Sequence, residues 1–165
     1  LLIIAYVSYR FEFKFGISAV LGLAHNVIIV LGAFALTQRQ IDSSFVAALL
    51  TIIGYSINDT IVIFDRIREN LKLHFRKNGD IVELVNTSIY QTMTRSIYTV
   101  STVLFATFAL YLFGGDTTKD FAFALLIGFF CGAYTSIFIA SPLWVTFRRY
   151  SDKKRLAKRM ADTGK

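Results

Sequence analysis

One carboxylate of this chain stands inside a long apolar stretch. Asp59 lies in Ile57-Asn58-Asp59-Thr60-Ile61, well within the apolar run of residues 45–64. Placing a carboxylate in hydrocarbon costs roughly 2.5–3.5 kcal/mol on insertion scales, and acids in that position usually mark a proton or ion pathway. Asp59 is therefore a candidate proton carrier. The alternative is a carboxyl that hydrogen-bonds to a neighbouring helix and never titrates.

Arg95 is the natural counter-charge for Asp59. It directly precedes Ser96 and the apolar run of residues 97–113. If Arg95 faces the other helices, it can approach Asp59 within the same half of the membrane. If it does not, its long side chain carries the guanidinium to the water interface. The sequence leaves direct pairing open.

Other polar residues in or beside the apolar runs are candidate supporting residues. Asn58 can hydrogen-bond near Asp59 or to another helix. Asp65 and Arg66 belong to a charged cluster where the run ends, read either as part of a proton path or subunit contact, or as surface ion pairing of Asp65 with Arg68. His25 lies in the middle of the run of residues 16–36, and is either a proton relay or a neutral packing histidine.

Two glycines predict close helix packing. Gly128 and Gly132 have the small-xxx-small spacing that lets membrane helices approach, and Ser136 and Ala140 continue the stripe. The sequence shows no metal-ligand spacing, phosphate-binding loop or nucleophile motif. We therefore expect no enzyme activity, no metal and no cofactor.

The elements that must position these residues are long apolar helices. Hydrophobic residues make up 55% of the 165 residues, and the mean hydropathy is +0.54. A membrane helix needs about 20 apolar residues, and a membrane strand needs only about 9–11 in alternation. We therefore predict an all-α, polytopic membrane bundle over residues 1–147. Its expected spans are about 1–9, 16–36, 45–64, 97–113 and 121–147, and the first is expected to be cut short by the start of the chain.

The basic residues give these spans an orientation. Fifteen Lys and Arg residues fall in alternate connections and in the tail of residues 148–165, and only Arg39 and Lys119 fall in the other connections. The positive-inside rule places the basic side and the C-terminus in the cytoplasm. The net charge of +7 is thus mostly a topology signal. We expect no nucleic-acid partner, although the basic tail can lie on anionic lipid.

Residues 81–92 have a helical apolar spacing after Asn78-Gly79, with Asp80 as the expected cap. We predict a cytoplasmic interfacial helix here. The alternative is one continuous helix through Arg95. Pro142, near the end of the last run, is expected to kink or end that helix.

Two stretches carry a family resemblance. Residues 54–70, GYSINDTIVIFDRIREN, resemble the signature of the SecF family of protein-export membrane proteins. Residues 91–96, QTMTRS, with residues 111–115, YLFGG, are similar to the next SecF span and its exit loop, and Leu23-Ala24-His25 also fits. One departure is Asn26, where the family usually has aspartate after the histidine, so a second titrating carboxyl there is not expected.

The resemblance implies a fold and a function. The five spans would be helices two to six of six, with the first helix and a periplasmic domain missing, and the bundle would resemble half of a transporter of the RND superfamily. The protein would work in the cell inner membrane with SecD, the SecY-SecE-SecG channel, and YajC or YidC. It would use the proton motive force to help a translocating polypeptide complete export. Asp59 and Arg95 match the family's proton-carrying aspartate and its partner arginine.

Two rival functions remain open at this point. An RND-type exporter of small molecules or lipids would use the same buried acid and the same helix layout. A passive scaffold that holds SecD near the channel would need Asp59 only as a structural residue. Proton-dependent activity of an Asp59→Asn variant separates transport from scaffolding.

Overall fold

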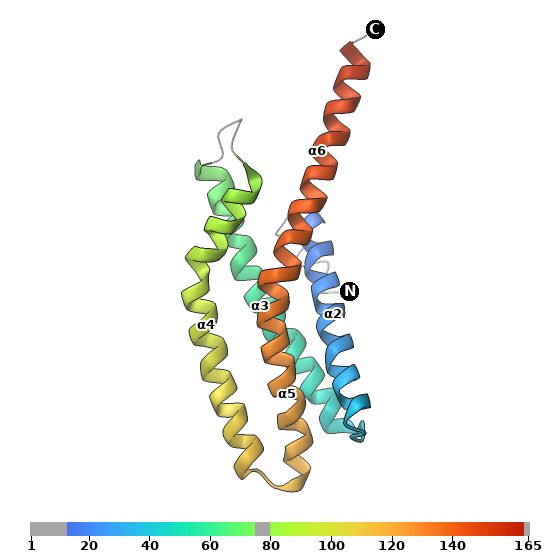
Figure 1. Ribbon diagram of the computed structural model, residues 1–165, viewed down its shortest axis with the longest axis vertical. Coiled ribbons are helices and arrows are strands. Elements are labelled where there is room, and N and C mark those ends of the chain that lie inside the picture. Colours follow the sequence, from blue (N-terminus) through green and yellow to red (C-terminus); the bar gives the residue numbers. More distant parts are fainter. Residues whose placement is uncertain (1–12, 75–79, 164–165) are drawn as a thin grey trace.

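The computed structural model describes residues 13–74 and 80–163, and these residues form a bundle of long helices (Figure 1). The elements are α2 (Phe13–Leu36), α3 (Ser43–His74), α4 (Ile81–Phe113), α5 (Asp116–Thr135), the π-helix η1 (Ser136–Ala140) and α6 (Ser141–Thr163). The expected all-α fold is confirmed. Residues 1–9, the first expected span, lie outside the described residues.

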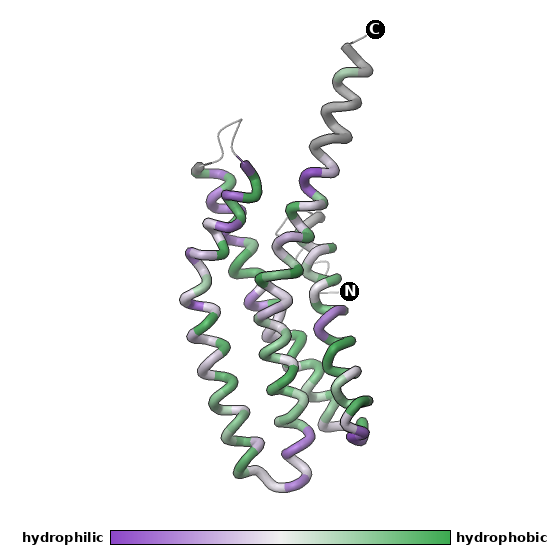
Figure 2. The backbone as a smooth tube through the Cα atoms, viewed as in Figure 1, coloured by the Kyte–Doolittle hydropathy of each residue, from purple (hydrophilic) through white to green (hydrophobic). Residues whose placement is uncertain are grey.

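Among the described residues, four stretches are long and apolar enough to cross a membrane. They are Phe15–Leu36, Ser43–Leu73, Ile81–Phe113 and Asp116–Ser151. Figure 2 shows hydrophilic positions at both ends of the bundle and only isolated ones partway along the helices. We call the end where α3 ends, α4 begins and α6 projects the basic end.

Two helices are longer than the apolar runs alone indicate. Residues 81–92 are not a separate helix, because α4 runs unbroken from Ile81 through Arg95 to Phe113. Asp80 caps it as expected, since its side chain accepts a hydrogen bond of 3.0 Å from Val82 N.

The last apolar run does not end at Pro142. The chain continues from α5 through η1 into α6, which projects beyond the other helices (Figure 1). Proline has no N–H and its ring clashes with the carbonyl four residues earlier in an α-helix. The π turn η1 ends two residues before Pro142, so the carbonyl four residues before the proline, that of Phe138, lies within this wider turn.

The interior has two apolar clusters, one towards each end. The cluster at the basic end contains Phe15, Phe64, Ile67, Val85 and Trp144. The cluster at the opposite end contains Val30, Phe34, Phe45, Ile52 and Phe129. Each helix that contributes to both clusters does so on either side of a short polar stretch. Some of the buried polar residues lie between these two apolar clusters, and we call this group the polar layer: Asn26, Ser56, Asp59, Thr60, Ser96, Thr135 and Ser136.

Candidate functional site

Asp59 lies in the polar layer on α3, and its side chain is only half satisfied. The residue is 8% exposed. Its Oδ1 accepts a hydrogen bond of 2.7 Å from Ser96 Oγ on α4. Its Oδ2 is buried and has no hydrogen-bond partner among the described residues. Buried polar atoms are normally paired, so a buried carboxyl oxygen without a partner calls for an explanation, and a functional role is one such explanation.

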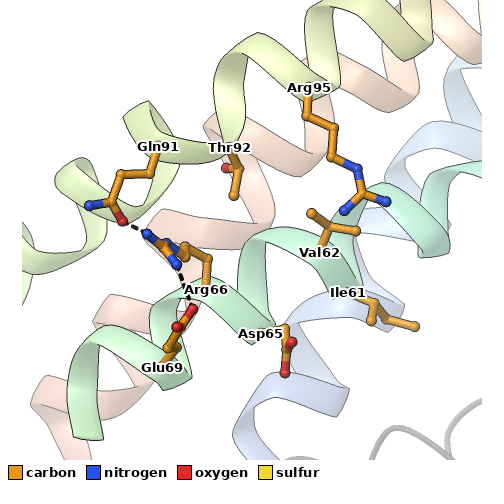
Figure 3. Close-up of a pocket in the computed structure, with 8 residues that line it drawn as sticks. All are labelled: Ile61, Val62, Asp65, Arg66, Glu69, Gln91, Thr92 and Arg95. Carbon is orange, nitrogen blue, oxygen red and sulfur yellow. Dashed lines mark hydrogen bonds and ion pairs between the residues drawn. The ribbon is translucent and has the colours of Figure 1, made fainter. Parts of the chain in front are cut away.

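Arg95 is close to Asp59 but does not pair with it in this arrangement. Within the described residues no ion pair joins the two side chains, although they interact electrostatically. Arg95 is exposed and extends from α4 toward α3, where it lines a pocket with Val62 (Figure 3). An uncompensated carboxylate would be costly at the buried position of Asp59, so this geometry suits the neutral acid.

The residue after Asp59 ties α3 to the π-helix. Thr60 Oγ1 donates 3.0 Å to the carbonyl of Ser56 and lies 2.9 Å from Ser136 Oγ. Ser141 Oγ, one residue beyond η1, donates 3.1 Å to the carbonyl of Ser136. The hydroxyls of α3 and α6 therefore hold both sides of η1. Single π turns inside α-helices are frequent at functional sites.

His25 and Asn26 extend the polar layer to α2. His25 Nδ1 lies 3.2 Å from Thr135 Oγ1, and Asn26 Nδ2 donates 3.2 Å to the carbonyl of Gly128. Asn26 Oδ1 is buried without a partner among the described residues. All four residues bind α2 to α5, so their contacts fit helix packing as directly as they fit a relay.

Gly128 and Gly132 let α5 come close to its neighbours. A Cβ on Gly128 would lie 2.3 Å from Ile52 Cδ1, and one on Gly132 would lie 3.1 Å from Asn26 Nδ2. No side chain fits at Gly128 without moving Ile52. The small-residue spacing thus brings α5 against α3 and α2 at the level of the polar layer.

A second polar network joins α3 and α4 nearer the basic end. Arg66 Nε donates 2.7 Å to Gln91 Oε1, and Arg66 Nη1 pairs with Glu69 at 2.6 Å (Figure 3). Buried Asn70 donates to the same Gln91 oxygen at 2.9 Å and to Ser88 Oγ at 2.8 Å. We call Arg66, Glu69, Asn70, Ser88 and Gln91 the basic-end network.

An open pocket of about 550 Å³ lies between this network and Arg95. Its polar lining includes Asp65, Arg66, Gln91, Thr92 and Arg95. Figure 3 shows Arg95 at one end of the lining residues and the Arg66–Glu69 pair at the other end. Ser96, which bonds Asp59, directly follows Arg95 in α4. The pocket therefore approaches Asp59 from the basic end.

The structure brings some predicted residues together and separates others. Asp59 and Ser96 meet between α3 and α4, and Arg95, the residue before Ser96, lines the pocket with Asp65 and Arg66. Asn58 is exposed on another face of α3, and no hydrogen bond to the described residues supports a role for it beside Asp59.

Sequence reasoning missed the hydroxyls that surround the carboxyl. Ser96 bonds Asp59 directly. Thr60, the residue after Asp59, is hydrogen-bonded to Ser136. A signal was present for two of them, because Thr60 and Ser136 each interrupt an apolar run, whereas Ser96 lies just before one. Ser136 was noted only as a small packing residue. A single sequence does not show which hydroxyls face a common point.

The arrangement can hold and release one proton. The carboxyl of Asp59 is buried, and only one of its oxygens accepts a hydrogen bond from a described residue, the hydroxyl of Ser96. With an arginine within electrostatic range, such a carboxyl can exist neutral or ionised. The polar pocket lined by Arg95 lies towards the basic end from Asp59. No group of three or more potential metal ligands occurs among residues 13–74 and 80–163.

Comparison with protein families gives one match over most of the chain. Residues 1–150 match the family described as protein export membrane protein SecD/SecF, C-terminal. The chain is 58% identical over 153 residues to a protein translocase subunit SecF from Alicyclobacillus acidocaldarius, covering 92% of this chain and 50% of that protein. It is 48% identical over 149 residues to the SecF of Desulfurispirillum indicum, covering 90% and 48%.

Solved structures give the same likeness. The crystal structure of SecDF in a super-membrane-facing form is similar with a TM-score of 0.90 and 43% identity, covering 95% of this chain and 21% of that one. SecDF from Thermus thermophilus is similar with a TM-score of 0.84 and 44% identity, covering 88% and 20%. The chain spans about half the length of the curated relatives that it matches.

Proposed function

Because this chain belongs to the SecD/SecF family of protein-export membrane proteins, we propose that it forms the membrane part of a Sec translocase subunit that uses proton movement to complete export. The observation that carries the proposal is the half-satisfied carboxyl of Asp59, buried between α3 and α4 with Arg95 nearby. The names of the relatives indicate the process, which is protein export. The polar layer contains Asp59, whose carboxyl can bind and release a proton.

The proposed orientation follows the positive-inside rule. The basic end faces the cytoplasm, and the connections after α2 and α4 face the other side of the inner membrane. The pocket lined by Asp65 and Arg95 then opens toward the cytoplasm. A proton that leaves Asp59 through this pocket moves down the gradient.

The proposed cycle has two states of the α3–α4 contact. In the first state Asp59 is neutral, keeps the bond to Ser96 that it makes here, and forms no ion pair with Arg95. The ionised Asp59 attracts Arg95 and pulls α4 toward α3. One charge moved through 100 mV is worth about 2.3 kcal/mol, which shifts a two-state equilibrium by about fifty-fold. SecD, the other half of the proposed transporter, would sense the shift across the shared membrane domain.

Replacing Asp59 with Asn in the full-length protein, together with SecD, tests this function. Membrane vesicles with a stalled preprotein are supplied with or without a proton gradient, and the completed fraction is measured. We expect Asp59→Asn to lose the stimulation by the gradient while the protein still assembles with SecD. Ser101→Ala is the control, since Ser101 lies further along α4 in an apolar groove. Undiminished stimulation in Asp59→Asn contradicts the proposal.

A further inference from the structure

We propose that Val62 is a hydrophobic gate between the pocket at the basic end and the carboxyl of Asp59. Its side chain keeps the water of the pocket away from the carboxyl until Arg95 moves, and it thereby limits the passage of protons. The inference rests on the proposed function, because it assumes that a proton leaves Asp59 through this pocket.

Val62 lies on the face of α3 that carries both polar levels of the α3–α4 contact. Residues three and four apart on a helix are neighbours on one face, so Asp59, Val62 and Arg66 form a single row. Asp59 and Arg66 are separated by about 10 Å along α3, at 1.5 Å per residue. The half-buried Val62 occupies the interval between them, so the row is polar at both ends and apolar in the middle.

The pocket reaches Val62 but not Asp59. Its apolar lining is Ile61 and Val62, and Asp59 is not part of the lining. The two apolar side chains differ in direction, because Ile61 packs against the apolar cluster at the basic end, whereas Val62 lies in the row of Asp59. Val62 is therefore the side chain that closes the pocket on the side of the carboxyl.

The facing residue of α4, Thr92, offers no polar bypass around Val62. The hydrogen bonds at the two polar levels pair α4 with α3 in antiparallel register, which places Thr92 at the level of Val62. Thr92 is buried, and its Oγ1 lies 3.1 Å from the carbonyl of Ser88 and 3.0 Å from that of Ile89. A threonine has one hydroxyl hydrogen, and here its own helix takes it. A stable water needs two or more polar partners, which this level does not supply.

Arg95 is the group that can cross this level. Figure 3 shows its side chain extending from α4 toward α3 and ending beside Val62. To form the ion pair of the second proposed state, the guanidinium must pass Val62 and reach Asp59. Apolar constrictions of this kind gate by excluding water, and a guanidinium with five N–H donors brings water with it.

Opening of the gate would thus be coupled to the change of charge. In the proposed step one proton passes from the Asp59 carboxyl to water in the pocket, and the carboxylate that remains pairs with Arg95. While Arg95 stays beside Val62, the carboxyl remains dry and keeps its proton. The gate therefore prevents protons from crossing without the movement of α4 that the cycle requires.

The test measures proton flux into lipid vesicles that contain the full-length protein with SecD and an enclosed pH-sensitive dye. A proton gradient is applied without any preprotein. Val62→Thr keeps the shape of the side chain and adds a hydroxyl, so we expect the flux to rise roughly fivefold, as for one hydrogen bond to water at the gate. Val103→Thr is the matched control, because Val103 is a partly buried valine of α4 packed against the opposite apolar cluster. It should leave the flux unchanged.

A second substitution shows whether the extra flux passes through the carboxyl. Adding Asp59→Asn to Val62→Thr should abolish the increase. An unchanged flux in Val62→Thr that still assembles with SecD overturns the inference and leaves the proposed function standing, as does extra flux that survives Asp59→Asn. If Val62→Thr does not assemble, Val62→Ala opens the same gate by removing two methyl groups, and the same outcomes apply. Export that is still stimulated by the gradient in Asp59→Asn alone overturns the proposed function, and this inference with it.

Discussion

The helices α3 and α4 meet through polar side chains at two levels, which differ in how fully their hydrogen bonds are made. In the basic-end network, Gln91 Oε1 accepts from both Arg66 and Asn70, and Asn70 also reaches Ser88. In the polar layer, Ser96 bonds one oxygen of Asp59, and the other oxygen has no partner within the described part of the chain. The basic-end network therefore holds α3 and α4 together, whereas in the polar layer the contact between the two helices can change.

The difference follows from the chemistry of the groups. Amides and arginine do not change their protonation state at physiological pH, so one fixed set of partners can satisfy all their hydrogen bonds. A buried carboxyl needs a donor when ionised and an acceptor when neutral. A fixed set of neighbours cannot meet both needs, so some group must move. The contrast predicts that substitutions in the polar layer alter both stability and coupling to the proton gradient, whereas substitutions in the basic-end network alter stability alone.

The largest effect on stability is expected from Ser96→Ala, which sharpens the contrast from the side of the polar layer. It removes the partner of Asp59 Oδ1 and leaves both carboxyl oxygens unbonded. Leaving a buried hydrogen-bonding group without its partner costs about 1–3 kcal/mol. We expect the free energy of unfolding to fall by that amount, measured by denaturant titration of the full-length protein in detergent. Ser101→Ala on the same helix should be neutral, and equal losses in both variants would contradict the assignment.

The second prediction concerns the close packing that shapes the polar layer. Gly128→Ala places a Cβ against Ile52, and overpacking of this kind costs about 1–3 kcal/mol. Gly54→Ala and Gly32→Ala are matched controls, since a Cβ there meets nothing within 4 Å. Thermal unfolding in detergent should show a lower midpoint for Gly128→Ala alone. A similar midpoint in all three would mean that α3 and α5 do not approach as described.

Much of this fold was predictable because hydrophobicity and charge are properties of segments. The apolar runs indicated helices, and the Asp80 cap was found at the expected residue. Where α4 begins was left open, since residues 81–92 suit either an interfacial helix or a continuous one. Tertiary packing decided this, through Val85 in the apolar cluster and Ser88 beside Asn70.

The candidate site was predictable only in part. The cost of burying a carboxylate singled out Asp59, and its neighbour in the helix, Asn58, was a reasonable addition. Residues adjacent in a helix point in different directions, so Asn58 faces away while Thr60 faces η1. The π turn itself has no sequence signal beyond Pro142.

The third prediction tests the basic-end network. Asn70→Ala removes two hydrogen bonds between α3 and α4 but leaves the Arg66–Gln91 bond in place. At about 1 kcal/mol per bond, we expect a loss of about 1–2 kcal/mol in the free energy of unfolding. The stimulation of export by the proton gradient should persist in the folded protein. Glu69→Gln, at an exposed ion pair, should cost less than 1 kcal/mol.

The smallest effect is expected at the cap of α3, outside both levels. Hydrogen bonds from Ser44 Oγ and Phe45 N hold the pKa of the Asp42 carboxyl below its usual value. The stabilisation from the charged cap is therefore complete above the pKa of the unfolded chain, and is lost as the pH falls through the lower folded pKa. Asp42→Asn should remove this acid dependence from the unfolding midpoint. An unchanged acid limb would show that Asp42 contributes nothing.

The proposed two-state cycle requires that α3 and α4 rearrange when Asp59 changes charge. The direct measurement is the separation of the Asp59 carboxyl from the Arg95 guanidinium in the full-length protein with SecD, determined by electron cryomicroscopy at one acidic and one alkaline pH. We predict that the two groups are apart at acidic pH, with Asp59 bonded to Ser96 as here. At alkaline pH we predict a direct ion pair. The same separation at both pH values would contradict the account.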